Sequence, residues 1–302
     1  MLCGLIYIEE RWIKVGTFEK ILGADVARSF IPLATDILSK RSNPKYIFLS
    51  QQDFDDLFNN DERDANSQYM KEIVYRVHFS AMSSIARNLE WLNGMKSAYE
   101  HGLYLPFASS FRSLIESTAD SFDSLLAVGL TVAENSVVIN ERLNKKGKGS
   151  NFITITELEN DLIHYSHARR LDKNENAPDT HKAKSAAAYV RNLDKKTDSN
   201  FYDCYGHLCQ LTHPAAEGVL HMMPQVDDYF VFDDKHGIKK IENLIEQYES
   251  FFTDLICYAF NPAILALKVI NYIDVPSCQS KLIDSINLNN LTAWKRCEAY
   301  LK

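Results

Sequence analysis

The densest group of chemically reactive side chains lies between Ser199 and His221, which holds three of the nine histidines, two tyrosines and a His–Pro step. His213, Glu217 and His221 follow one another at intervals of four, so one continuous helix would align three nitrogen and oxygen ligands for a divalent metal. Gly218 weakens such a helix. The two histidines would also lie roughly 12 Å apart along its axis, at about 1.5 Å per residue. We therefore expect no metal and no cofactor at this place.

His213 is the residue of interest in this stretch. Proline starts a helix more readily than it continues one, so Pro214 predicts that a helix over 199–211 ends and that another begins at Pro214. His213 then lies at the break, where a side chain faces a cleft rather than a core. Tyr205 lies two turns earlier on the first helix. The alternative is that His213 only caps a helix and that Tyr205 fills core.

Arg112 and Glu116 form the second candidate group, in the segment FRSLIEST. Residues four apart share one face of a helix, and the apolar neighbours Phe111, Leu114 and Ile115 put the pair near the rim of a packed face. The simplest interpretation is an intrahelical ion pair, which contributes a few tenths of a kcal/mol when exposed.

The elements that position these groups are expected to be helices. Apolar residues at intervals of three and four predict long helices over 61–99 and 106–134, joined by a short link at Gly102. Such a link gives an antiparallel pair, which is the start of a bundle. A further helix is predicted over 238–260, with a break at Asn261–Pro262, and Pro32 is expected to kink or restart an earlier helix.

The fold class that follows is an all-α multi-helix bundle with an antiparallel long-helix pair and at most one or two short strands, one of them over 229–232. We divide the chain into an N-terminal helical extension over 1–60 and a helical bundle over 61–302. A single domain is the alternative, because no linker marks the boundary.

Charge is distributed unevenly along the chain. The whole protein carries a net charge of −7, yet the segment 142–196 has 12 Lys and Arg against 7 Asp and Glu. An acidic molecule does not coat nucleic acid non-specifically, because that requires clustered cations. A local basic surface remains compatible with the composition, and its candidate RNA-binding residues are Lys145, Lys146, Lys148, Arg169 and Arg170. The alternative is a solvated surface of mixed charge.

Cysteine usage and hydropathy indicate the compartment. None of the six cysteines forms a C-x-x-C pair, and scattered cysteines in apolar helices fit a reducing environment. No apolar run approaches the roughly 20 residues that span a bilayer, and the first residues lack a basic leader. We expect a cytoplasmic protein that does not enter a membrane.

The motif F-R-x-x-x-E at Phe111–Glu116, followed by Y-x-x-L-x-x-x-x-H-P at Tyr205–Pro214, resembles the HEPN-like helical proteins and their bacterial relatives in toxin–antitoxin and anti-phage defence systems. The resemblance covers about 72–221. It implies a helical bundle that forms a homodimer or binds a protein partner, and it implies a metal-independent ribonuclease. In that family an Arg precedes a His by four to six positions on one helix. Here the site must be built from separate helices.

The resemblance also implies roles for the candidate residues. His213 would be the general base or acid for cleavage of RNA by its own 2′-hydroxyl, since histidine exchanges protons near neutral pH. Arg112 would stabilise the phosphate charge, Glu116 would orient Arg112 or His213, and Tyr205 would hold a phosphate oxygen. The alternative function is a non-catalytic interaction or regulatory module of a defence or toxin–antitoxin complex, which the aromatic C-terminal third favours.

Overall fold

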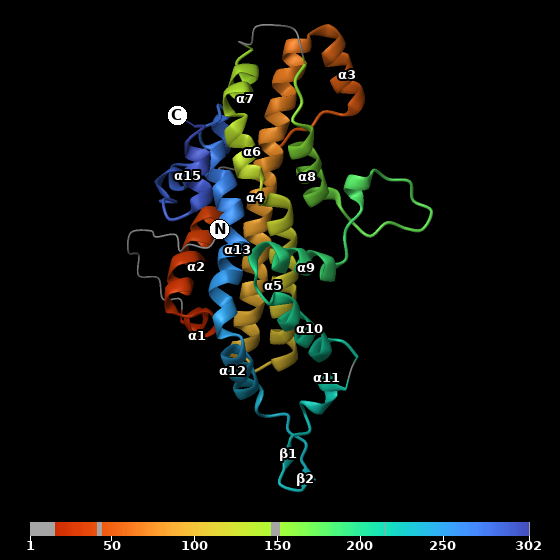
Figure 1. Cartoon of the computed structure of the whole chain (residues 1–302), viewed down its shortest axis with the longest axis vertical. Helices are drawn as coiled ribbons and strands as arrows, with labels where there is room; N and C mark the ends of the chain where they lie inside the picture. Colours follow the sequence, from red (N-terminus) through yellow and green to blue (C-terminus); the bar gives the residue numbers. More distant parts are fainter. Residues whose placement is uncertain (1–15, 41–43, 146–151, 215, 302) are drawn as a thin grey trace.

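The computed structural model describes residues 16–40, 44–145, 152–214 and 216–301. In these ranges the chain is an elongated multi-helix bundle, and its only sheet is a small hairpin at one end (Figure 1). The fold class expected from the sequence is confirmed.

An antiparallel helix pair, α4 (Glu62–Glu100) and α5 (Tyr104–Leu125), forms the centre of the bundle. Asp61 caps α4 by accepting from the backbone N–H groups of Arg63 and Asp64. Gly102, in the left-handed region at φ 65°, turns the chain into α5. The predicted helix over 106–134 is divided in the structure, and its second part is α6 (Val128–Glu134).

The most buried element is α13 (Glu249–Ile270), which packs on α4, α5 and α6. The expected break at Asn261–Pro262 is wrong: α13 runs through Pro262, and the chain bends instead at Tyr248, after α12 (Gly237–Gln247). Proline removes one backbone hydrogen bond from a helix. Here the packing of α13 on α4, α5 and α6 outweighs that loss. By length and composition α13 is the one described helix apolar enough to cross a bilayer, but 89% of its most apolar window is buried among the other helices.

The N-terminal helices share this core. Helix α1 (Thr17–Leu22) and helix α2 (Ala24–Ser39) lie against α4 and α13, and Phe30 stacks on Phe260 with ring centroids 5.9 Å apart. The helix does not restart at Pro32, since α2 is continuous through it, and the alternative of a kink there stays a prediction. The boundary between an extension and a bundle at residue 60 stays a prediction. The intervening helix α3 (Gln51–Asn60) has no buried residue and begins at a Ser50 cap.

The remaining helices cover the central pair or extend from it. The helices α8, α9 and α10 lie along α5, and α15 lies on α6 and α13. Their bounds are Ser136–Leu143 (α7), Thr156–His167 (α8), Ala186–Thr197 (α9), Phe201–Thr212 (α10), Glu217–Leu220 (α11), Lys281–Ser285 (α14) and Thr292–Glu298 (α15), with 3₁₀ turns at Asp179–His181 and Pro276–Cys278.

The hairpin consists of β1 (Gln225–Val226) and β2 (Tyr229–Phe230), and it projects from the end of the bundle below α12 (Figure 1). The strand expected over 229–232 is therefore present in part. Its partner precedes it along the chain, and Asp227 makes the turn with a left-handed backbone at φ 52°.

Candidate functional site

The structure brings Arg112 and Glu116 together with Tyr205 and His213. The first pair lies on α5, and α10 packs against that helix. Helix α10 ends at Thr212, and His213 has an extended backbone (φ −86°, ψ 164°) with an exposed side chain. The break before Pro214 is thus confirmed, although the next helix, α11, begins only at Glu217.

The Arg112 guanidinium reaches across to the end of α10. Its Nη1 donates to Thr212 Oγ1 at 2.7 Å and lies 3.4 Å from His213 Nε2. An arginine nitrogen only donates, so Nε2 of His213 is the acceptor and the proton of the neutral ring is on Nδ1. Since 3.4 Å is long for a hydrogen bond, His213 is held loosely, while Thr212 fixes Arg112 firmly.

Glu116 holds the other side of Arg112. Its Oε1 lies 3.6 Å from Arg112 Nε, so the intrahelical ion pair expected from the sequence is formed. The two side chains are 20% and 30% exposed, which makes this a rim site rather than a sealed one. Arg112 Nε itself is buried and has no hydrogen-bond partner in the described residues. That donor is out of reach of a ligand, whereas Nη2 makes no hydrogen bond with the described residues and keeps donor capacity for one.

Tyr205 contributes a phenol that stays protonated. Burial raises its pKa well above the ordinary value, and hydrogen bonds with Cys209 and the nearby Glu116 carboxylate raise it further. In this state the hydroxyl is a hydrogen-bond donor at neutral pH. The cluster thus combines a cation, a carboxylate, a neutral phenol and a histidine with an accepting nitrogen. We name these four residues, with Thr212, the Arg112–His213 cluster.

The aligned metal ligands considered above do not form, because the helix is interrupted between His213 and Glu217. Glu217 Oε1 instead lies 3.3 Å from Nε2 of His207, whose Nδ1 is 2.7 Å from the Tyr248 hydroxyl. His221 packs on Tyr104 with ring centroids 5.2 Å apart. Within the ranges that the structure describes, no three His, Cys, Asp or Glu side chains gather as metal ligands.

Of the basic residues selected for RNA binding, the three that the structure describes are not gathered at this cluster. Lys145 follows α7 at one end of the long axis and pairs with Asp64 at 2.5 Å, whereas α10 lies in the opposite half (Figure 1). Arg169 pairs with Glu175 in the connection between α8 and α9, and Arg170 is exposed beside it. Lys146 and Lys148 lie outside the described residues. A role in RNA binding stays a prediction for all five.

A cleft of about 370 Å³ opens beside the cluster, between α4, α5, α8 and the start of α9. We call it the α5–α9 cleft. Glu116 lines it, so one carboxylate belongs to both the cleft and the Arg112–His213 cluster.

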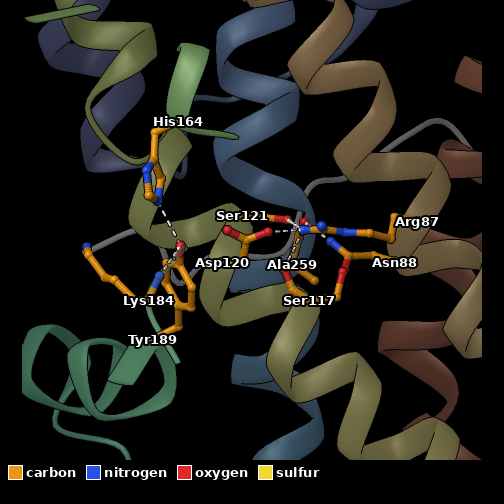
Figure 2. Close-up of polar contacts among 9 residues, drawn as sticks. All are labelled: Arg87, Asn88, Ser117, Asp120, Ser121, His164, Lys184, Tyr189 and Ala259. Carbon is orange, nitrogen blue, oxygen red and sulfur yellow. Dashed lines mark hydrogen bonds and ion pairs between the residues drawn. The ribbon is translucent and has the colours of Figure 1, made fainter. Parts of the chain in front are cut away.

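Arg87 and Asp120 face each other inside this cleft (Figure 2). Arg87 Nη2 donates to Asp120 Oδ2 at 2.6 Å and to Ser121 Oγ at 3.2 Å. The Arg87 guanidinium lies over the Tyr165 ring, with 5.3 Å from Cζ to the centroid. Burial lowers the pKa of Arg87, but Tyr165 and Asp120 outweigh burial and raise the pKa above its ordinary value. The Arg87 guanidinium therefore keeps its charge.

A histidine and a tyrosine form the opposite wall (Figure 2). His164 Nδ1 lies 3.0 Å from the carbonyl of Thr180, which only accepts, so Nδ1 carries the proton. In the neutral ring Nε2 then accepts from the Tyr189 hydroxyl at 2.7 Å. Burial raises the pKa of Tyr189, so the phenol keeps the proton that it donates. Lys184, at the same wall, donates to Asp123 at 2.5 Å.

Sequence reasoning did not select Arg87, Asp120, Lys184 or Tyr189. One signal was present: Arg112, Glu116 and Asp120 follow one another at intervals of four, so a polar stripe continues along α5 beyond the chosen pair. Arg87 and Tyr189 have no such signal, because only the packing of α4 and α9 on α5 brings them to the stripe.

Comparison of the chain with protein-family models, with curated proteins and with solved structures gives no match. The function is therefore argued from the geometry of the cluster and the cleft.

Proposed function

We propose that the protein is a HEPN-like, metal-independent ribonuclease whose active site is the Arg112–His213 cluster, and that it acts as an effector of bacterial toxin or anti-phage defence. The observation that carries the proposal is the approach of Arg112 Nη1 to within 3.4 Å of His213 Nε2 from a different helix. An arginine fork beside a histidine with an accepting nitrogen, at an exposed helix end, suits a phosphodiester whose own hydroxyl is the nucleophile.

The proposed reaction is transesterification within the RNA. His213 Nε2 removes the proton of the 2′-hydroxyl, and the 2′-oxygen bonds to the adjacent phosphorus. The P–O5′ bond breaks, and O5′ takes a proton from water. The hydroxide that remains takes the proton from His213, which returns to its neutral form. The products are a 2′,3′-cyclic phosphate and a 5′-hydroxyl, and no oxidant or metal enters the balance.

The other residues have supporting roles in this proposal. Arg112, held in place by Thr212, donates to the phosphate oxygens instead of to His213 and stabilises the charge of the pentavalent state. Glu116 and Thr212 hold Arg112 from two sides, at 3.6 Å and 2.7 Å. Tyr205, protonated because its pKa is raised by burial, donates to a phosphate oxygen. DNA lacks the 2′-hydroxyl and is not a substrate.

The test is cleavage of single-stranded RNA by the purified protein in the presence of EDTA, with the new ends identified by mass spectrometry. We expect 2′,3′-cyclic phosphate ends from the parent. His213→Ala and Arg112→Ala are expected to lower the rate by about a hundredfold or more, the usual loss for a general base or for a donor to a developing charge. Expression of the parent, and not of these variants, should slow bacterial growth.

The matched control is His101→Ala. His101 is also an exposed histidine after a helix, α4, and its Nδ1 contacts only the Ser97 carbonyl at 2.8 Å. Its variant should cleave RNA like the parent. A parent that leaves RNA intact under these conditions, or a His213→Ala variant as active as the parent, would refute the ribonuclease.

A specific observation favours the alternative of an interaction module. The hairpin and its flanks expose large apolar side chains that nothing in the described chain covers: Val219, Leu220, Met223, Val226, Tyr229, Phe230, Phe232 and Ile238. Exposed apolar groups in one place mark an interaction surface. We call this surface the hairpin patch, and we propose that its occupant is a second copy of the chain.

Charge supports the choice of a second copy. The hairpin tip carries Asp227 and Asp228, while the groove at its base is lined by Lys235, Lys239 and Lys240 together with Asp233 and Asp234. A two-fold axis between two antiparallel hairpins brings the acidic tip of each copy to Lys235 and Lys239 in the groove of the other, where Lys240 is already paired with Asp233. Each hairpin also has unpaired strand edges, which pair readily with an identical edge.

A further inference from the structure

We propose that the RNA strand runs from the Arg112–His213 cluster along α10 towards α9, and that Arg191 on α9 binds a neighbouring phosphate of the same single strand. The inference rests on the proposed ribonuclease, because it assigns a second contact to the same substrate. It is carried by a row of four side chains, Arg112, Tyr205, Tyr202 and Arg191, which we call the arginine–tyrosine row.

The arginine–tyrosine row joins three helices. Tyr202 lies one turn before Tyr205 on α10, and the centroids of the two rings are 6.2 Å apart. Helix α9 packs on α10, and the Arg191 guanidinium lies over the Tyr202 ring, with 4.5 Å from Cζ to the centroid. Two ring contacts therefore connect Arg191 with Tyr205, the residue of the cluster that we assign to a phosphate oxygen.

The Arg191 guanidinium has unused donors with a fixed direction. Arg191 is exposed, and its Nη2 donates to the Tyr202 hydroxyl. In the described chain no carboxylate pairs with Arg191, and its Nη1 and Nε make no hydrogen bond. A planar guanidinium that stacks on an aromatic ring keeps its other N–H groups for a phosphate, which accepts two parallel hydrogen bonds. The tyrosine therefore positions the arginine without neutralising it.

The charges around Arg191 are mixed. Lys195, one turn later on α9, is exposed and has no ion-pair partner in the described chain. The Asp194 carboxylate accepts from two backbone N–H groups at the start of α10, so its oxygens are already occupied. Asp203 is exposed on α10. The row thus offers a directed hydrogen-bond site for one phosphate rather than a strongly basic surface.

The α5–α9 cleft, which also adjoins the cluster, is the alternative direction for the strand. Its two cations are already paired, Arg87 with Asp120 at 2.6 Å and Lys184 with a carboxylate of α5 at 2.5 Å. Glu116 lines the cleft as well, so a phosphate there would meet two carboxylates, and like charges oppose binding. Arg191 has no such partner, and we therefore assign the second phosphate to the row.

The experiment is the binding of a labelled single-stranded RNA whose 2′-hydroxyls are methylated, measured by fluorescence anisotropy over a series of salt concentrations. The methyl groups remove the nucleophile of the proposed reaction, so binding is measured without cleavage. Arg191→Ala should weaken binding about tenfold, as expected on loss of hydrogen bonds to a charged group. It should also reduce the slope of log K against log salt by about 0.7, the contribution of one phosphate of a single strand.

Matched variants assign this loss to a phosphate contact. Arg191→Lys keeps the charge without the planar fork, so it should retain the salt slope and recover part of the affinity. The control is Arg63→Ala, because Arg63 is also an exposed helical arginine but lies in the first turn of α4, in the half of the bundle opposite to α10 (Figure 1). This variant should bind RNA like the parent. Circular dichroism and thermal unfolding show that each variant is folded.

Unchanged binding by folded Arg191→Ala, or an equal loss in Arg63→Ala, overturns the second phosphate contact. The two proposals fail in different ways. RNA binding that depends on Arg191, in a protein that cleaves no RNA, supports the contact and refutes the ribonuclease. Cleavage that depends on His213, in a protein whose Arg191→Ala variant keeps its affinity, refutes the contact alone. In an active protein Arg191→Ala should raise KM and leave kcat nearly unchanged, because Arg191 does not touch the reacting atoms.

Discussion

At the scale of single residues, Thr212 determines where Arg112 points. Its hydroxyl donates to the Leu208 carbonyl at 2.7 Å and accepts from Arg112 Nη1 at 2.7 Å. A hydroxyl has one proton, so the first bond fixes the direction of the second. The last turn of α10 thereby holds a guanidinium from α5 beside His213.

Thr212→Val should therefore lower RNA cleavage without removing a reacting group. Loss of a hydrogen bond to a charged group corresponds to about a tenfold or larger fall in rate. We expect the fall in kcat with little change in KM, because Arg112 remains present but is no longer aimed. Thr212→Ser keeps the hydroxyl and should restore most of the rate. Equal losses in the valine and serine variants would contradict this positioning role.

At the scale of elements, α4 carries polar side chains into the core, and one of them, Asn88, joins three helices. Asn88 is buried, donates to the Ala259 carbonyl of α13 at 2.9 Å and accepts from Ser117 of α5 at 2.6 Å (Figure 2). Such bonds fix the register of three helices, because a displaced helix would leave buried polar groups unpaired. The position of Arg87, one residue before Asn88, follows from that register.

His78 on α4 makes the stability of the bundle depend on pH. Its side chain is buried against Tyr46, whose hydroxyl is 2.6 Å from Nδ1, and burial lowers the pKa of His78 from 6.5 to about 4. Between these pH values the unfolded chain binds a proton at His78 and the folded chain does not. The free energy of unfolding therefore falls as the pH drops below about 6.5, and this loss stops growing below about pH 4.

We expect the His78 contribution to the free energy of unfolding to fall by about 2 kcal/mol from pH 7 to pH 5. Urea unfolding of the parent and of His78→Phe at both pH values measures it. The variant keeps a buried ring without the titrating nitrogen, so its stability should change less over this interval. Parallel losses in both proteins would show that other groups cause the dependence.

At the scale of the whole molecule, the two ends of the bundle differ. The hairpin patch extends beyond the core at the α12 end, where Tyr229 and Phe230 are 57% and 61% exposed (Figure 1). Covering large apolar side chains of this kind stabilises an interface by about 25 cal/mol per Å². If the proposed dimer forms, we therefore expect it to form through the hairpin rather than along the bundle.

Replacement of Tyr229 and Phe230 by Ser should convert a dimer to a monomer. Light scattering coupled to gel filtration measures the mass, and added salt should weaken the dimer because the Asp tip of one copy attracts Lys235 and Lys239 of the other. Val137→Ser is the control, since Val137 is equally exposed on α7, far from the hairpin. A parent that is monomeric at micromolar concentrations would contradict self-association.

The sequence by itself determined the helical fold. In 61–134 apolar residues recur every three or four positions, which places them in one stripe along each helix, and packing against a neighbouring helix removes that stripe from water. It also determined the break at His213, since Pro214 lacks the N–H that a continuing helix needs. It did not determine that α13 continues through Pro262 and α2 through Pro32. At both places burial against neighbouring helices outweighs the loss of one backbone hydrogen bond.

Only the tertiary structure decided which polar groups meet. Arg112 and Thr212 are 100 residues apart, and Arg87 and Asp120 are 33 apart. Local patterns report the face of a helix on which a residue lies, but not which helix packs on that face or in which register. The packing of α10 on α5 made the Arg112–His213 cluster, and the packing of α4, α8 and α9 on α5 made the cleft beside it.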